Sequence, residues 1–256
     1  MVNWSTEKEA TDMNDDLVRL KIPAASVSGF GSSNFDVLRT GPSFKLLGLE
    51  VPDAVADAFM ITDLRVGKDS QLISPSCFPA SFFAASSRRE RLGLLGVAHN
   101  NTYLKVSLTN LCADERVFEG SFVGSFAGSA DADREHERMI VGLGHTIVAS
   151  GSEVYVYKAQ PQLKFWPKRL AVPREVLGTG ASGAFEVVAA AVLNYRRELR
   201  QKIEGPFVTD SYSERCEGNF ECPVDMEPAD ILAITVRNRT DSQRAFYGTV
   251  AGTVTW

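Results

Sequence analysis

Hydrophobic and polar residues alternate along much of this chain, in short stretches separated by turn residues. Between positions 104 and 109, apolar side chains at 104, 106 and 108 are interleaved with polar ones at 105, 107 and 109. A period of two residues is typical of a β-strand with one face in a core and the other toward water. We predict strands at residues 18–22, 35–39, 44–51, 59–66, 104–108, 117–126, 154–158, 163–172, 185–193, 232–236 and 245–254.

Helix is a minority prediction. Residues 80–91 and 194–203 could each form a short helix, and residues 184–199 taken alone have the composition of a longer one. The chain contains an internal repeat, described next, in which residues 59–72 correspond to 184–199. Residues 59–72 contain β-branched residues and a glycine that suit a strand and a turn. We therefore prefer a strand at 185–193. Short strands about ten residues apart favour sandwiches or barrels over a parallel α/β sheet.

The chain contains an internal repeat. Residues 103–128 align without a gap with residues 231–256, at an offset of half the chain length. Earlier segments also match, at smaller offsets that grow in steps, which places small insertions in the loops of the second copy. A fixed-offset match is the signature of duplication. The identical pairs are Leu104 with Leu232, Asn110 with Asn238, Arg116 with Arg244, Phe118 with Phe246, Gly120 with Gly248 and Gly124 with Gly252.

The predicted fold is all-β, with two tandem β-sandwich domains of jelly-roll type that arose by internal duplication, and with short helices only. Two domains of roughly 120 residues each lie near the common domain size, and each can bury a core of its own. We expect a long loop at 205–230. The predicted divisions are a flexible N-terminal arm at 1–16, a first β-sandwich repeat at 17–128, a linker at 129–145 and a second β-sandwich repeat at 146–256.

The charge balance is mild. The chain has 27 basic and 32 acidic residues and a net charge of -5, which argues against a general nucleic-acid binder. Basic clusters at 88–91 and 196–202 leave a local nucleic-acid contact open without indicating one. No apolar run approaches the ~20 residues of a membrane span, and the N-terminus lacks the apolar stretch of a signal peptide. We expect synthesis in the cytoplasm, no transmembrane segment and no secretion by a signal peptide.

No reaction centre is visible. His99, His136 and His145 form no paired metal-binding spacing, so the two-domain cupin pattern is absent. Residues 178–183 spell GxGxxG, but they fall where the second copy has an insertion, which favours a lengthened loop over a dinucleotide site. A serine-nucleophile elbow is missing as well. We predict no catalytic, cofactor-binding or metal-binding residues, no cofactor, and a protein that is not an enzyme.

The late cysteines leave three alternatives open. Cys216 and Cys222 have five residues between them, inside a stretch rich in acidic residues. They could be unpaired thiols, close a small disulfide loop, or offer two thiolates to a metal. The spacing does not decide between these states.

Three residues are candidates for contacts between subunits: Arg116, Arg244 and Trp4. The two arginines occupy matching positions just after a turn and two residues before a phenylalanine, while Trp4 lies in the arm. The alternative for each arginine is a structural role, with its stem over the phenylalanine and its guanidinium on turn carbonyls. The arm is mostly polar, with a single tryptophan, and is expected to order only against a partner.

The predicted architecture resembles that of double jelly-roll viral coat proteins. That resemblance implies a structural protein that self-assembles, as a homo-oligomeric trimer or larger, into the symmetric capsid of a viral or phage particle, as coat or decoration protein. Its partners would be further copies and other particle proteins, and its final location the virion. The alternative is a tandem β-sandwich that binds carbohydrate or another ligand, with Trp166, Tyr155, Tyr157 and Tyr212 as candidate contacts.

Overall fold

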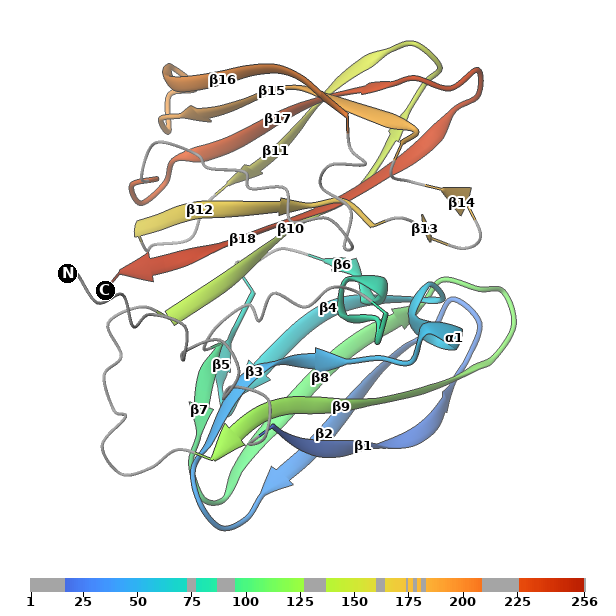
Figure 1. The fold of residues 1–256 in the computed structure, drawn as a ribbon, viewed down its shortest axis with the longest axis vertical. Helices are drawn as coiled ribbons and strands as arrows, with labels where there is room; N and C mark the ends of the chain where they lie inside the picture. The colour runs from blue at the N-terminus through green and yellow to red at the C-terminus, as the bar shows by residue number, and fades with distance from the viewer. Residues whose placement is uncertain are drawn as a thin grey trace, which may run out of the picture.

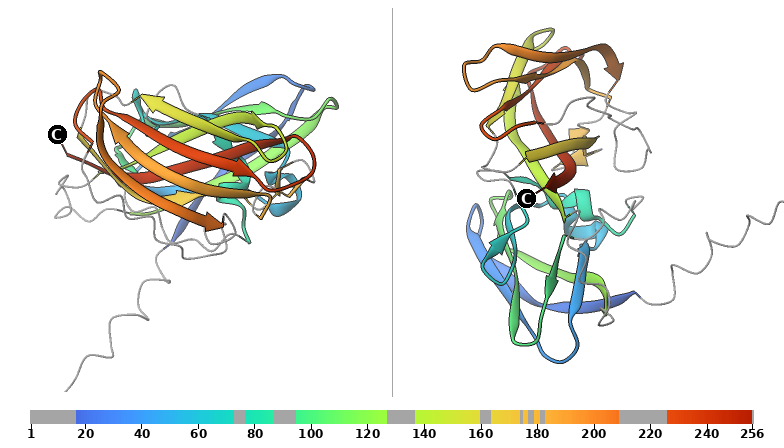
Figure 2. Two further views of the ribbon diagram at one scale, coloured as in Figure 1. Left: turned by 90° about the horizontal axis from the view of Figure 1, so that it is seen from above. Right: turned by 90° about the vertical axis from the view of Figure 1, so that its left-hand side faces the viewer.

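The computed structural model describes residues 17–72, 77–86, 95–126, 137–159, 164–173, 175–176, 179–180, 183–208 and 226–255. The described chain is mostly antiparallel β-strand, arranged in two units that lie one above the other (Figure 1). The right-hand view of Figure 2 shows that the blue-to-green half of the sequence forms one unit and the yellow-to-red half the other. Each unit contains two sheets, as predicted.

The first sandwich is built from two main sheets whose apolar faces enclose one core. One sheet has the order β1 (Val18–Val27), β9 (Arg116–Phe126), β3 (Phe44–Glu50), β7 (Gly96–Ala98). The other has the order β2 (Ser32–Arg39), β8 (Thr102–Asn110), β4 (Phe59–Val66), β5 (Asp69–Ser70), with β6 (Phe78–Pro79) also paired to β4. Two short helices join the strands, α1 (Asp53–Ala56) and the 3₁₀ turn η1 (Ala80–Phe83).

The second sandwich repeats this order. One sheet runs β10 (Glu137–Val148), β18 (Arg244–Thr255), β12 (Lys164–Ala171). The facing sheet runs β11 (Glu153–Ala159), β17 (Ile231–Asn238), β15 (Phe185–Leu193), β16 (Leu199–Val208). A small hairpin of β13 (Glu175–Val176) and β14 (Thr179–Gly180) lies beside them.

The strand order is that of a jelly roll. In each unit the first four long strands alternate between the two sheets, and the last two return to pair inside them, one in each sheet. This double Greek-key path is the one expected of jelly rolls. The place of β7 is taken in the second unit by a single bridge between Phe165 and Met226, which matches the pairing of Phe44 with Ala98. The fold class predicted from the sequence is confirmed.

Both cores are organised around the same aromatic pair. The rings of Phe59 and Phe118 meet edge to face, with centroids 5.2 Å apart. The corresponding rings of Phe185 and Phe246 are 5.3 Å apart in nearly the same geometry. All four side chains are fully buried, and such pairs add about 0.5–1.5 kcal/mol beyond the burial of their area.

Strand irregularities are duplicated along with the strands. The ladder of β3 shifts register between Leu46 and Gly48, and that of β12 shifts between Pro167 and Arg169, the same positions in the repeat. The shift in β4 after Ile61 likewise recurs in β15 after Val187. Bulges bend a strand and increase its twist. The two sandwiches therefore share their curvature as well as their strand order.

The repeated glycines mark places where strands approach closely. A Cβ built on Gly124 would lie 2.0 Å from the carbonyl oxygen of Lys45, and one built on Gly252 would lie 2.2 Å from that of Trp166. The residue before each of these carbonyl groups is a phenylalanine, Phe44 or Phe165, and its ring also lies against the glycine. Glycine within a strand commonly marks such a close approach of another backbone.

A continuous apolar seam joins the two sandwiches. β6 of the first unit lies against β10 and β18 of the second, as Figure 1 also shows. Leu72 forms a parallel bridge with Ile140, and the Ile140 amide donates to the Gln71 carbonyl oxygen at 3.2 Å. Ile140 and Ala251, both from the second unit, are buried in the core cluster of the first. The units are therefore packed against each other through side chains of both.

The structure corrects three local predictions. The predicted linker 129–145 is wrong in its second half, because β10 begins at Glu137 and pairs with β18 along its length. A helix at 194–203 is wrong, since these residues form a turn and the start of β16, the edge strand of its sheet. Within 80–91 only η1 is helical among the described residues. The preferred strand at 185–193 is confirmed.

Several predictions concern residues outside the described part of the chain. They include the arm with Trp4, His136, and the segment 209–225 with Tyr212, Cys216 and Cys222. The loop expected at 205–230 starts later than predicted, because β16 continues to Val208. The two described helices have four residues each, far short of a membrane span.

Candidate functional site

The end of each sandwich at which the last two long strands join is held by a buried asparagine. The Asn110 Nδ2 donates to the carbonyl oxygens of Val27 at 3.0 Å, Ser28 at 3.2 Å and Asp114 at 2.8 Å. Its Oδ1 accepts from the Cys112 amide at 2.8 Å. One side chain thus ties the β1–β2 turn to the β8–β9 turn, and makes this end of the sandwich rigid.

Asn238 does the same in the second copy. Its Nδ2 donates to the carbonyl oxygens of Val148 at 3.0 Å and Ser242 at 2.7 Å, and its Oδ1 accepts from the Thr240 amide at 2.9 Å. Both asparagines are fully buried. Because buried amides need partners for both ends, this identity between the copies has a structural cause.

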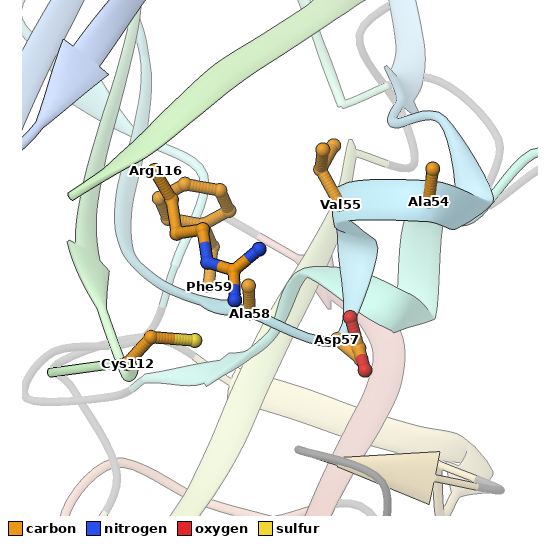
Figure 3. Close-up of a pocket in the computed structure, with 7 residues that line it drawn as sticks. All are labelled: Ala54, Val55, Asp57, Ala58, Phe59, Cys112 and Arg116. Carbon is orange, nitrogen blue, oxygen red and sulfur yellow. The ribbon is translucent and has the colours of Figure 1, made fainter. Parts of the chain in front are cut away.

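The side chain of Arg116 is exposed at this end of the first sandwich. It lies opposite Val27 in the ladder between β1 and β9. Its exposed side chain points into a hollow of about 340 Å³, which α1 and the β8–β9 turn border (Figure 3). The other lining residues are Ala54, Val55, Asp57, Ala58, Phe59 and Cys112. A guanidinium above an apolar floor can bind a carboxylate or stack on an aromatic ring.

Arg244 occupies the same register position but a different environment. It lies opposite Val148 and is half-buried. The next residue, Ala245, packs against the small cluster of Met60 and Tyr247 at the seam between the sandwiches. In that cluster, burial and then the neighbouring Cys77 raise the pKa of Tyr247 above its usual value. The two arginines therefore differ in exposure, Arg116 being exposed and Arg244 half-buried.

The two most exposed large apolar side chains in the described part of the chain lie in turns. Phe30 is 70% exposed in the β1–β2 turn, and Tyr195 is 67% exposed in the turn between β15 and β16. Val117, at the start of β9, and Leu199, at the start of β16, are also exposed. Sequence reasoning missed Phe30. The available signal was a phenylalanine between two glycines in a turn, where its ring has no strand face to pack on.

Trp166 and the tyrosines at 155 and 157, three of the residues of the alternative ligand-binding interpretation, lie in different sheets. Trp166 is 49% exposed on β12, with the Lys168 Nζ 5.2 Å from the centre of its ring. Tyr155 and Tyr157 lie on β11, in the opposite sheet of the same sandwich. Stacking platforms for sugars need aromatic side chains on a common surface. This arrangement gives little support to a carbohydrate site made of these three residues.

His99 is exposed, with its Nδ1 3.0 Å from the Ser43 Oγ. Within the described ranges, no three or more histidine, cysteine, aspartate or glutamate side chains form a group suited to a metal ion. Within the glycine-rich stretch 178–183, the described residues Thr179 and Gly180 form β14, which pairs with β13.

No protein-family model matches the sequence, and no curated protein matches it either. Among solved structures, the chain is similar to the major capsid protein P2 from bacteriophage PM2, with a TM-score of 0.46 and 7% sequence identity. The match covers 94% of this chain and 98% of that one. The assignment of two jelly rolls rests on the strand order of this chain itself.

Proposed function

We propose that this protein is a structural subunit which assembles with copies of itself into the symmetric shell of a viral or phage particle. The observation that carries the proposal is the duplicated jelly roll: two sandwiches with the same strand order, bulges and asparagine contacts, packed through one seam. A protein of this kind presents two similar surfaces, one on each sandwich, whose relative orientation is fixed by the seam. Three such molecules around an axis place six similar sandwiches in a ring, which suits quasi-equivalent packing.

The residues shared by the two copies support this proposal. The asparagines close a turn, the phenylalanines fill a core and the glycines permit close strand approach. Each has a role in building the sandwich, which is what a shell protein needs from duplication. The proposal assigns no catalytic activity, and fold analogy alone would be a weak basis for one.

The proposed partners are other copies of the chain, in trimers or larger bodies, and further proteins of the same particle. The virion is the proposed final location. Of the two predicted arginine contacts, Arg116 is the better placed, because its side chain is exposed at one end of the first sandwich. Whether the protein forms the main shell or decorates it is a matter for imaging.

Size-exclusion chromatography with light scattering tests the proposal. We expect trimers or larger bodies at micromolar concentration, and closed or sheet-like assemblies by electron microscopy. A chain that remains monomeric up to the highest soluble concentration and under crowding conditions would contradict the proposal. A glycan array serves as the counter-test. Specific binding by a monomer would favour the ligand-binding alternative, with loss of binding in Trp166→Ala.

A further inference from the structure

Phe30 and Gly151 occupy the same position in the two copies of one turn. Each lies three residues after a matched valine, Val27 or Val148. The residue after each closes the turn in the same way, with Gly31 donating to the Ser28 carbonyl oxygen at 2.9 Å and Ser152 to that of Ala149 at 3.1 Å. Both positions are left-handed, with φ of +53° at Phe30 and +65° at Gly151. The second copy uses the residue that adopts this backbone without strain.

The first copy retains a phenylalanine there despite two unfavourable effects. A bulky side chain at positive φ strains the backbone, and this ring is 70% exposed to water. The turn beneath it is rigid, since the Phe30 amide donates to the Cys112 carbonyl oxygen at 2.9 Å and Asn110 holds both neighbouring loops. A strained, exposed and rigidly held aromatic is typical of an anchor for another molecule.

A second exposed anchor, Tyr195, lies in a strained turn of the other sandwich. The turn between β15 and β16 contains Arg197 at a φ of +63°, whereas the matching hairpin of the first sandwich has Gly67 at the same φ. Asn194 fixes this turn through its Oδ1, which accepts from the Arg196 and Glu198 amides at 2.9 Å each. The turn holds Tyr195 outward, with the Arg196 guanidinium 5.3 Å from the centre of its ring.

These two surfaces carry opposite charge. Around Phe30, the acidic end consists of Asp57, Asp114 and Glu115 beside Arg116, so carboxylates exceed guanidinium groups. Around Tyr195, the basic hairpin consists of Arg196, Arg197 and Lys202 beside Glu198, and Arg200 is paired with Asp230, so cations exceed carboxylates among the described side chains. Each surface therefore combines exposed apolar anchors with a charge that the other would neutralise. Two copies of the same surface facing each other would instead bring like charges together.

The two surfaces cannot meet within one molecule. The acidic end lies at the right of the lower sandwich in Figure 1, beside α1, whereas the turn of the basic hairpin lies at the left of the upper one. We propose that the basic hairpin of one copy binds the acidic end of the next copy, with Phe30 and Tyr195 as the anchors. This contact is heterologous, and such contacts close into rings when their rotation permits. The inference rests on the proposed function and names the contact through which assembly occurs.

Charge reversal tests this contact directly. Asp114→Lys with Glu115→Lys, or Arg196→Glu with Arg197→Glu, should each weaken self-association at least about tenfold. A chain with all four changes should regain most of it, because the charges are complementary again. High salt should weaken the wild-type assembly, as expected of partly exposed charge pairs. Phe30→Gly should raise the melting temperature of the monomer while also weakening association at least about tenfold.

Matched controls come from the other copies of the same loops. Asp241→Lys in the β17–β18 turn and Lys68→Glu in the β4–β5 turn change charge at corresponding places and should leave association within about twofold. Circular dichroism and melting curves verify that every variant is folded. If the wild type does not associate, the proposed function fails. If it associates and the charge reversals have no effect, or the four-change chain is not rescued, only this contact is refuted.

Discussion

Asn110 and Asn238, half a chain apart, bind equivalent backbone atoms in two different sandwiches. Each donates to the carbonyl oxygen of the last residue of the unit's first strand, at 3.0 Å in both copies. Each also donates to the carbonyl oxygen four residues further along its own turn. This pair explains why asparagine was kept at both positions after the duplication. No other side chain of that length offers two N–H donors and a carbonyl acceptor.

Asn110→Ala should lower the free energy of unfolding by about 2 kcal/mol, since buried carbonyl oxygens lose their donor and the Cys112 amide loses its acceptor. Urea denaturation measures the change. Asn34→Ala, at an exposed asparagine of β2, is the control and should change stability by less than about 0.5 kcal/mol. Equal effects in the two variants would show that the hydrogen bonds of Asn110 do not stabilise this end.

Gly124→Ala should destabilise the protein by about 3 kcal/mol or prevent folding, because the new methyl group would lie 2.0 Å from the Lys45 carbonyl oxygen. The matched control is Gly151→Ala, where the added Cβ meets nothing within 4 Å and only the positive φ opposes it. That control should cost about 1 kcal/mol. Thermal melts distinguish the two, and a smaller loss in Gly124→Ala than in Gly151→Ala would contradict the close approach.

Phe30→Gly should stabilise the monomer by about 0.5 kcal/mol. Relief of about 1–2 kcal/mol of left-handed strain exceeds the loss of about 0.4–1 kcal/mol that a glycine brings through the freer unfolded chain. Gly151→Phe, the mirror substitution in the second copy, should destabilise the protein by a similar amount. Chemical denaturation under monomeric conditions measures both changes. A loss of stability in Phe30→Gly would mean that the ring packs against its own chain.

Stability should fall at high pH through Tyr247. Its pKa is raised in the folded protein by burial and by Cys77, whereas in the unfolded chain it lies near 10. The folded state therefore holds the proton more tightly. The stabilisation is complete below the unfolded pKa and is lost as the pH rises from there through the folded pKa. Tyr247→Phe should flatten the decline in melting temperature above pH 10, and an unchanged decline would exclude this tyrosine as the cause.

The sequence allowed most of the long strands to be predicted because their alternation is local. β10 was missed in the predicted linker, since Gly142, Gly144 and His145 interrupt its apolar pattern and a bulge shifts its register. β16 was missed because an edge strand with many charges has no strict alternation. In both cases pairing with a distant strand decides the conformation, and a single stretch of sequence does not contain that information.

The candidate contact surfaces were harder to predict. Arg116 could be selected from the repeat, but its exposure beside a hollow depends on α1, which no periodic pattern announced. Phe30 could not be selected at all from identity between the copies, because the informative fact is a difference, phenylalanine against glycine at one backbone geometry. In a duplicated protein, contacts with other molecules that arose after duplication are best sought at positions where the backbone agrees but the residue type differs.

The seam at Ile140 and Ala251 has a consequence for the history of the chain. Side chains from the later half fill the interior of the earlier half, so cutting the gene back to one copy would leave that interior incomplete and open to water. Once such packing had formed, neither half could be lost without exposing part of the core of the other. From then on each half could change its outer loops independently without the two ever separating.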